Sequence, residues 1–395
     1  MQKEQLESWH THPVSEGELK RRYGAVQAAL KNEEVDCLIL QTHSNIFDSN
    51  IRYFLDIHTG SYGTTLMIPA DGGMIYLSHG ENDDNAPVPP WAGNVEKAIV
   101  NHFCPPFPFT NYCAAELVEK EIRERGFKKV GLAYLQLMGY SFGDHLTRTL
   151  ADVEFVDFSY QLHEITAVKS EEEWKLIDLS MRAHEKLMEM LPALIVPGRA
   201  EYEILADLKR QAYMIGCEVC GSVFVNASRP GKPGAMSPKA MGSRRIEPGD
   251  NVNVLIEVSG PGGMYGELSR IFSMSDSADN ITDLFEISKE IQHTVAAAAK
   301  PGVTGAELNS VYNECAAMHG FGPNLRYSGH GQGYDMMESP AISKDENMAL
   351  KEDMLFAIHP GLFRNGELAV CCDNFRITAD GAELIIRTPQ KVFHI

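Results

Sequence analysis

The amino-acid sequence predicts a two-domain protein of the mixed α/β (α+β) class, with a small domain over residues 1–162 and a larger one over 163–395. Three observations support this. The length of 395 residues suits two hydrophobic cores better than one. Helical and strand-like apolar patterns both occur in each half. Hydrophobic residues at 44% and charged residues at 23% are typical of a globular chain.

The first half alternates between helical and extended patterns. Residues 18–32 carry apolar side chains at helical spacing, and 35–40 form a short apolar run that predicts a buried strand. Residues 65–68 and 74–77 predict a hairpin around the turn at 70–73. A helix at 114–125 precedes another strand at 128–132, so this half indicates a small α/β domain.

The second half begins with a long helical pattern at 165–188, in which Ser170 precedes three glutamates and is expected to cap a helix N-terminus. Further helices are predicted at 199–215, 280–298 and 304–318, with strands between them. Pro-Gly pairs at 197, 248 and 301 separate these segments.

The charge balance and the cysteines limit which binding partners and which cellular compartment we expect. The chain has 35 basic and 54 acidic residues, and a net charge of −19 repels phosphate backbones and anionic membranes, so we expect no nucleic-acid and no membrane partner. No segment approaches a membrane span and the start lacks an apolar leader, which predicts a cytoplasmic protein. The eight cysteines are irregularly spread and are expected to be reduced thiols, Cys217 and Cys220 included.

Two acidic residues are predicted to face each other across a hairpin. Residues 252–258 and 265–274 read as strands around a turn that contains Gly262, and this places Glu257 opposite Glu267 with Cβ atoms about 5 Å apart. Like charges at that distance need a proton, a cation or a substrate between them. A one-residue change of register would separate them, and two solvated edge carboxylates remain the alternative.

Other ligand-capable residues collect downstream. His330 lies among glycines in 327–333, His359 ends an apolar strand just before Pro360, and Cys372 and Asp373 end another apolar run. Strand ends are common places for functional residues. Each histidine alone is more often a core residue than a ligand, but the pattern as a whole predicts one site.

These motifs resemble the creatinase, aminopeptidase P and prolidase family, known as peptidase family M24, which has a pita-bread fold. In the first half, residues 50–54 and 60–63 resemble the creatinase-type N-terminal domain. The resemblance in the second half rests on residues 167–173, Pro197-Gly198, residues 301–304, Gly329-His330-Gly331 and Pro360-Gly361.

The resemblance implies a changed metal centre. Peptidases of this family hold two metal ions with two Asp, one His and two Glu, and the matching positions are Glu257, Glu267, His330, His359 and Cys372. Only the histidine is kept in kind, and Met337 stands where the peptidases keep a second histidine. These five side chains suit either no metal or a single zinc or iron ion, and the standard peptidase route is not expected.

Other family members broaden the choice of reaction. Creatinase works without a metal, but Pro238, Ser269 and Thr64 replace three of its functional residues, so creatine is not the expected substrate. The family also includes ectoine hydrolases and a lyase that cleaves dimethylsulfoniopropionate. Members commonly form homodimers in which one subunit reaches the other's site, and His58 and Tyr62 are the residues expected to bind substrate in this way.

We therefore expect a hydrolase that cleaves a C–N bond in a small polar, amidine- or betaine-like substrate. His330 or His359 would be the general base, with Glu267 also catalytic, and Glu257 would bind a cationic group. Tyr265 and Arg270 are expected to support substrate binding, although an arginine at such a position is more often a structural partner for a carboxylate. The alternatives are a lyase, a metal-dependent Xaa-Pro aminopeptidase and an inactive relative that only binds.

Overall fold

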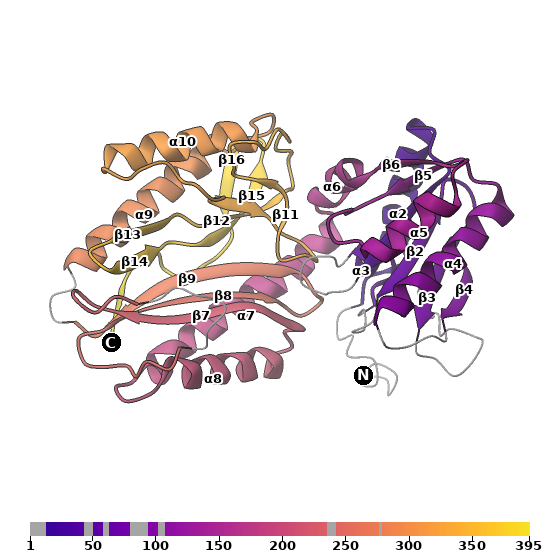
Figure 1. Ribbon diagram of the computed structural model, residues 1–395. Helices are drawn as coiled ribbons and strands as arrows, with labels where there is room; N and C mark the ends of the chain where they lie inside the picture. Colours follow the sequence, from indigo (N-terminus) through magenta and orange to yellow (C-terminus); the bar gives the residue numbers. More distant parts are fainter. Residues whose placement is uncertain are drawn as a thin grey trace. The chain divides into compact units, whose positions relative to one another are not determined.

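The computed structural model describes residues 13–42, 50–57, 63–79, 94–101, 107–234, 242–275 and 279–395 (Figure 1). The chain divides into two compact units, residues 13–166 and 167–395. This division and the predicted boundary at 162/163 both fall within helix α6 (Ser159–Ala167). Among the described residues, no helix combines the length and the apolar character needed to cross a membrane.

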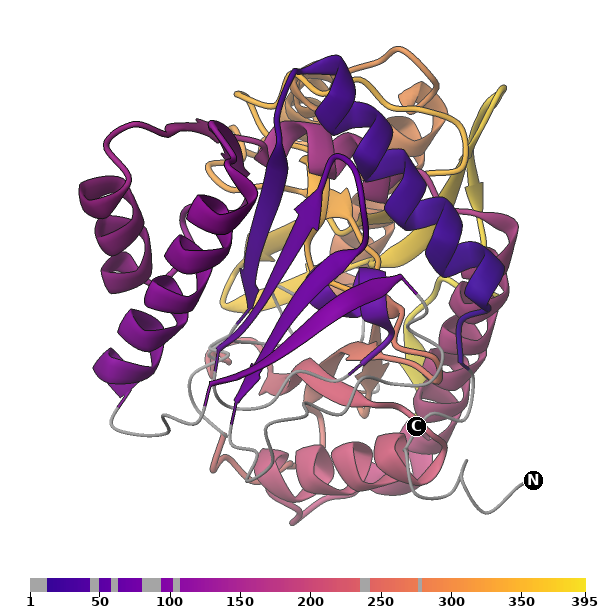
Figure 2. The same cartoon turned by 90° about the vertical axis from the view of Figure 1, so that its right-hand side faces the viewer.

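The first unit is a mixed six-stranded sheet in the order β4-β3-β2-β1-β5-β6. Figure 2 shows α2 on one face of this sheet and α4 and α5 on the other. The core under α4 and α5 includes Ile39, Ile75, Val118 and Phe142. The elements are α2 (Glu16–Asn32), β1 (Cys37–Thr42), α3 (Asn50–Leu55), β2 (Thr64–Pro69), β3 (Met74–His79), β4 (Val95–Asn101), α4 (Phe107–Arg125), β5 (Lys129–Leu132), α5 (Tyr140–Thr149) and β6 (Glu154–Asp157).

The second unit begins with a correction to the predicted helix at 165–188. Helix α6 ends at Ala167, the chain is extended over the next three residues, and α7 (Glu171–Leu194) starts anew. The break follows from the capping box at Ser170, whose hydroxyl accepts from the Glu173 amide while the Glu173 carboxylate accepts from the Ser170 amide. The predicted cap is confirmed, and it divides the helical pattern.

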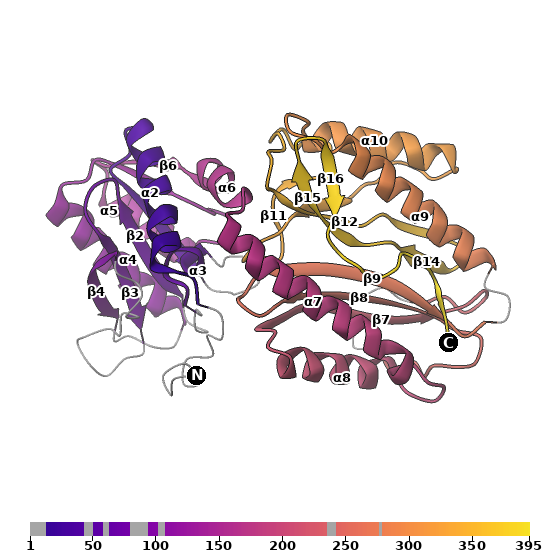
Figure 3. The ribbon, with the colours of Figure 1, turned by 180° about the vertical axis from the view of Figure 1, so that it is seen from behind.

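Two sheets form the centre of the second unit. The four-stranded sheet has the order β17-β9-β8-β7 and contacts α7 and α8, and Figure 3 shows α7 crossing β8 and β9. The five-stranded sheet has the order β11-β10-β12-β15-β16 and packs against α9 and α10. The elements of the second unit after α7 are α8 (Glu201–Met214), β7 (Val219–Ser228), β8 (Asn251–Ser259), β9 (Tyr265–Ser273), α9 (Asp279–Ala298), α10 (Gly305–Met318), β10 (Gly329–Gly331), β11 (Glu338–Ala341), β12 (Leu355–Ile358), β13 (Gly361–Arg364), β14 (Glu367–Val370), β15 (Asp373–Thr378), β16 (Gly381–Leu384) and β17 (Phe393–His394).

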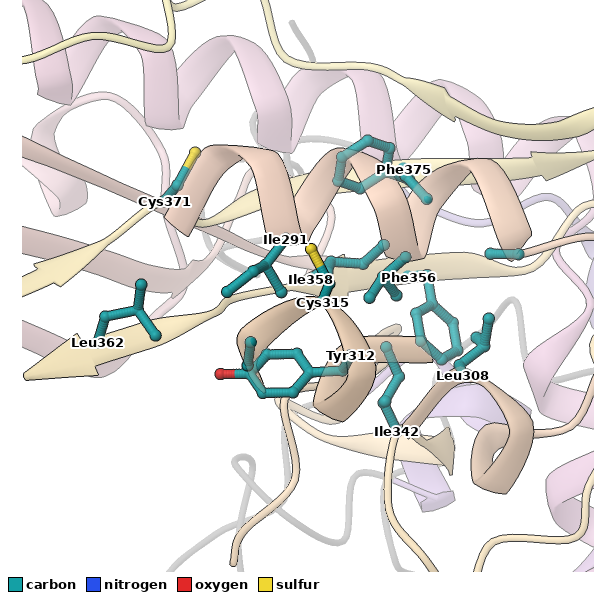
Figure 4. Packing of buried hydrophobic residues seen from close by; sticks show 14 of the residues in the cluster. Ile291, Leu308, Tyr312, Cys315, Ile342, Phe356, Ile358, Leu362, Cys371 and Phe375 are labelled. Atoms are coloured by element: carbon teal, nitrogen blue, oxygen red, sulfur yellow. The ribbon is translucent and has the colours of Figure 1, made fainter. Parts of the chain in front are cut away.

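The main core of this unit lies between the five-stranded sheet and helices α9 and α10 (Figure 4). Phe356, Ile358 and Phe375 contribute from the strands, and Ile291 and Leu308 from the helices. Because β12 and β15 are held by this core, the residues at their ends are placed on rigid backbone. Those ends carry His359 and Asp373, beside the strand pair β8–β9.

Candidate active site

The hairpin β8–β9 brings the two glutamates together as predicted. Glu257 pairs directly with Glu267 in the antiparallel register. The turn between the strands is closed by Gly262 and Gly263, whose φ angles of 86° and 92° favour glycine. The two residues are 6% and 4% exposed, which excludes the alternative of solvated edge carboxylates.

Both histidines come from the five-stranded sheet. His330 lies in β10, opposite Ala357 of β12, and the His359 amide donates to the Ser328 carbonyl at 2.9 Å. The two imidazole centroids are 5.2 Å apart. The Tyr327 ring stands edge-on to both, at 5.6 Å from His330 and 5.7 Å from His359. His330 is buried and lies on the closed side of the site, whereas His359 is partly exposed and lies on the side open to solvent.

Two hydrogen-bond acceptors face each other at the centre of the site. His330 Nδ1 is 2.9 Å from the Gly331 carbonyl, which can only accept, so Nδ1 bears the proton and Nε2 has a lone pair. Nε2 is 3.6 Å from Glu267 Oε2, a buried atom with no hydrogen-bond partner in the described part of the chain. Ligand atoms of Glu267, His330 and His359 all lie within 4.8 Å of one another.

Burial dominates the protonation of these groups. It raises the pKa of Glu267 to about 7, against a lowering effect of the Cys372 hydrogen bond. It also raises the pKa of Glu257 well above its usual range, with a further contribution from the negative charge of Glu267. Burial lowers the pKa of His330 to about 4, and burial together with His330 lowers that of His359 to about 3. Both imidazoles are therefore neutral at pH 7.

Two side-chain amides that were not predicted from the sequence, Gln332 and Asn374, form a chain of hydrogen bonds between the two glutamates, called here the amide relay. Gln332 Nε2 donates to Glu257 Oε1 at 3.1 Å, and Asn374 Nδ2 donates to Gln332 Oε1 at 2.7 Å. The Glu267 amide in turn donates to Asn374 Oδ1 at 2.7 Å. Each amide is thereby fixed in one orientation. The only available signal was position, since Gln332 and Asn374 lie within two residues of His330 and Cys372.

Arg270 is a structural partner of a carboxylate, which is one of the two roles considered for it from the sequence. Its guanidinium donates to Asp373 Oδ1 at 2.6 Å, and all three nitrogens donate to protein acceptors. The other acceptors are the carbonyls of Ser269, Cys372, Thr388 and Pro389. With its donors used in this way and no exposed surface, Arg270 links β9 to β15, and its part in substrate binding stays a prediction.

Tyr265 and Cys372 are also fully enclosed. Gly221 makes room for Tyr265, because a Cβ there would lie 3.0 Å from the tyrosine ring. The pKa of Cys372 is raised well above its usual range by burial and then by Glu267, which keeps the thiol protonated. All seven described cysteines are unbonded, as expected for reduced thiols. His58, Tyr62 and Pro238 lie outside the described residues, so the contribution of His58 and Tyr62 to a partner's site stays a prediction.

Comparison with known proteins decides the family. Residues 175–379 match Metallopeptidase family M24, and residues 22–168 match the Creatinase/Prolidase N-terminal domain. The chain belongs to family M24. The resemblance found in the sequence and the fold class are thereby confirmed, and so is the expectation of a hydrolase that acts on carbon–nitrogen bonds.

Named relatives of this M24 protein are peptidases at low identity. The Xaa-Pro dipeptidase of Pyrococcus horikoshii is 26% identical over 69% of this chain and 81% of the relative. The uncharacterized peptidase YqhT of Bacillus subtilis is 23% identical over 69% of this chain and 75% of the relative.

Solved structures share the fold of the M24 chain. The Xaa-Pro dipeptidase from Bacillus anthracis has a TM-score of 0.76 at 17% identity and covers 95% of this chain and 100% of its own. The X-Pro aminopeptidase from Thermotoga maritima has a TM-score of 0.78 at 20% identity, with 94% and 99% covered.

The residues present are compatible with a divalent metal ion. The family is one of metallopeptidases, but of the five matching positions only Glu267, His330 and His359 bring ligand atoms within 4.8 Å of one another among the described residues. Glu257 is engaged by Gln332, and Cys372 hydrogen-bonds to Glu267. The donor set of one carboxylate and two neutral imidazoles is one that zinc and iron accept.

Proposed function

We propose that this M24 hydrolase cleaves a C–N bond in a small polar substrate at a centre where Glu267, His330 and His359 hold one divalent zinc or iron ion. The observation that supports this most is the buried, unpartnered Glu267 Oε2, 3.6 Å from the lone pair of His330 Nε2. Two acceptors in that position destabilise the fold unless a proton or a cation lies between them. Two histidines and one glutamate form a known ligand set of catalytic zinc.

This proposal changes the part that the histidines play. A neutral imidazole with its lone pair directed at a carboxylate is suited to bind a metal, so His330 and His359 are assigned as ligands and not as the general base. When bound, the ion would acidify a water molecule and polarise the substrate. Glu257, held by Gln332, is the carboxyl left to accept the proton of that water, because a cation beside it would favour the ionised form of a carboxyl whose pKa burial raises.

The substrate class follows from the same carboxyl. Glu257 can accept a hydrogen bond from the nitrogen of the scissile bond and pass its proton to the departing nitrogen. An amidine or other cationic nitrogen suits this position because a positive charge offsets the repulsion between Glu257 and Glu267. We therefore retain a small amidine-like solute as the proposed substrate, and betaine-like solutes stay in the substrate panel for their positive charge, because a quaternary nitrogen has no N–H to donate.

A second candidate is hydrolysis of Xaa-Pro peptides. It is favoured by the names of the relatives in Pyrococcus horikoshii and Bacillus anthracis. Against it, His359 and Cys372 occupy positions where the family resemblance implies glutamates, and no bridging carboxylate is available from them. Xaa-Pro dipeptides therefore belong in the substrate panel beside cyclic amidines and betaines.

Metal content and turnover test the proposal together. Protein purified without added metal is analysed for bound ions, and a thermal-shift screen of the panel selects a substrate. Glu267→Gln and His330→Gln should each lower the metal content by one equivalent and abolish turnover. The matched variant Glu257→Gln should keep the ion and lose turnover, because it removes only the proton acceptor.

Three outcomes would contradict the proposal. If His330→Gln retains the full metal content of the wild type, the ion is not held where we place it. If the product formed in heavy-oxygen water carries no label, the reaction is an elimination. Ligand binding without turnover across the panel would indicate a relative that only binds.

A further inference from the structure

A second group of metal-ligating side chains lies on helices α9 and α10. Ligand atoms of Glu290, Cys315 and His319 all lie within 4.8 Å of one another. Cys315 and His319 are four residues apart at the end of α10, so they share one face of the helix, and Glu290 faces them from α9. None of the three belongs to the candidate active site.

The Cys315 thiol and the Nε2 atom of His319 are both enclosed, but they differ in their hydrogen bonding. Cys315 is 2% exposed and packs among core residues near Ile291 and Tyr312, as Figure 4 shows. Its thiol makes a weak hydrogen bond to Thr294 Oγ1 at 3.7 Å. His319 Nε2 is an enclosed atom that makes no well-formed hydrogen bond within the described ranges.

The glutamate provides both charge and access. Glu290 Oε2 lies 3.2 Å from His319 Nε2, and its side chain is 55% exposed. It lines an open surface groove together with Asp283 and Glu286, and the cations Lys289 and Arg364 line the same groove. Lys289 pairs with Glu286, so Glu290 is the carboxylate of this groove that faces the thiol and the imidazole. A divalent ion can therefore reach the enclosed thiol and imidazole from this side.

We propose that Glu290, Cys315 and His319 form a second metal site, which binds Zn²⁺ or a similar borderline divalent ion with water as the fourth ligand. Bond lengths of about 2.0–2.3 Å in a tetrahedral site place ligand atoms roughly 3.3–3.8 Å apart. The histidine and glutamate atoms are 3.2 Å apart and the cysteine sulfur lies within 4.8 Å of both, so small rotations of the partly exposed Glu290 and His319 side chains can complete the set. Thiolate and imidazole ligands disfavour Mg²⁺ and Ca²⁺. Binding displaces the thiol proton of Cys315 to solvent.

This second metal site would link helices α9 and α10, which support the backbone of the active site. The second ion itself would take no part in catalysis. Gln292, two residues after Glu290, donates to the carbonyls of Ile358 and Cys371 at 2.8 and 3.0 Å. An ion that binds α9 to α10 therefore stabilises the backbone that precedes His359 and Cys372. The proposal does not depend on the proposed function.

Cobalt substitution tests which thiol is a ligand. Apoprotein prepared with a chelator is titrated with Co²⁺, and the thiolate-to-cobalt charge-transfer band in the near ultraviolet is recorded. We expect the band in the wild type, in Cys372→Ser and in the active-site variant His330→Gln, and its loss in Cys315→Ser. A band that persists in Cys315→Ser, or that disappears only in Cys372→Ser, would overturn the second site.

Zinc titration calorimetry tests the other two ligands without altering the core. Glu290→Gln and His319→Gln change partly exposed side chains and should each weaken Zn²⁺ binding at this site by more than about 100-fold, beyond the effect of losing an outer hydrogen-bond partner. Glu286→Gln is the matched control on the same helix and should bind as the wild type does. Equal Zn²⁺ affinity in Glu290→Gln, His319→Gln and the control would refute the proposal, leaving only a surface ion pair.

Discussion

The buried ion pair between Arg270 and Asp373 should contribute a large part of the stability of the second unit. Both side chains are 0% exposed, and the charged atoms are 2.6 Å apart. The change Arg270→Met removes the cation and leaves the Asp373 carboxylate buried. Its remaining amide donors are Gln390 Nε2 at 2.8 Å and Gln292 Nε2 at 3.2 Å, which carry no compensating charge.

The expected loss follows from that uncompensated charge. Removing one partner of a buried pair costs about 3–5 kcal/mol in the free energy of unfolding. In a domain of this size each kcal/mol corresponds to about 2–4 °C, so Tm should fall by roughly 6–20 °C. The double variant Arg270→Met/Asp373→Asn removes both charges and should recover much of this loss, because the two effects are coupled.

Scanning calorimetry of the two variants and of Asp373→Asn measures the coupling, and kinetics below the lowered Tm measures substrate binding. We expect an unchanged KM for Arg270→Met at temperatures where the variant is folded. A stability loss under about 1 kcal/mol, well below the cost of breaking a buried pair, combined with a raised KM would refute the reasoning. It would return Arg270 to the substrate-binding role that the sequence suggested.

Three further perturbations have expected outcomes. In the presence of chelator, Glu267→Gln should gain stability relative to the wild type as pH rises from about 4.5 to about 7, by up to about 3 kcal/mol. The sign follows because the folded carboxyl keeps its proton up to about pH 7, whereas the unfolded one ionises near 4.5; a flat difference in Tm between pH 5 and 8 would contradict it. Gln332→Leu should lower kcat by about 10–100-fold through the loss of a supporting hydrogen bond, measured beside a circular dichroism spectrum that shows a folded protein. Lys169→Met breaks a buried pair with Glu338 and should cost about 3–5 kcal/mol by denaturant unfolding, whereas Lys344→Met in an exposed pair should cost about 0–1 kcal/mol.

The parts of the site that sequence could predict are those set by local geometry. The turn at Gly262 determines the register of its hairpin, and a strict alternation of side chains then places Glu257 opposite Glu267. The approach of His330 to His359 depends instead on the pairing of β10 with β12, which are far apart along the chain. Their convergence was inferred from the accumulation of ligand-type residues and from the family resemblance.

The directions in which side chains point within the site could not be predicted from the sequence. Nothing in the order of residues indicates that Gln332 turns toward Glu257 or that Asn374 accepts from the Glu267 amide, because both contacts cross between sheets. The choice of Asp373 as the carboxylate partner of Arg270 likewise depends on where β15 begins beside β9. Burial was equally hidden, and it moves the pKa values of the histidines below the range expected of a general base.

The balance of charge in the centre supports one ion in place of two. The ligand set implied by the family resemblance has four carboxylates, enough to neutralise two divalent cations. In this chain the two carboxyls are Glu257 and Glu267, since His359 is a neutral imidazole and Cys372 a buried, protonated thiol. Two carboxylates neutralise one divalent ion, and a second would leave uncompensated charge in a site that is almost closed to water. The histidine at 359 and the cysteine at 372 each remove one negative charge from the centre. Together they remove the two negative charges that would neutralise a second divalent ion, so the two replacements have one common effect.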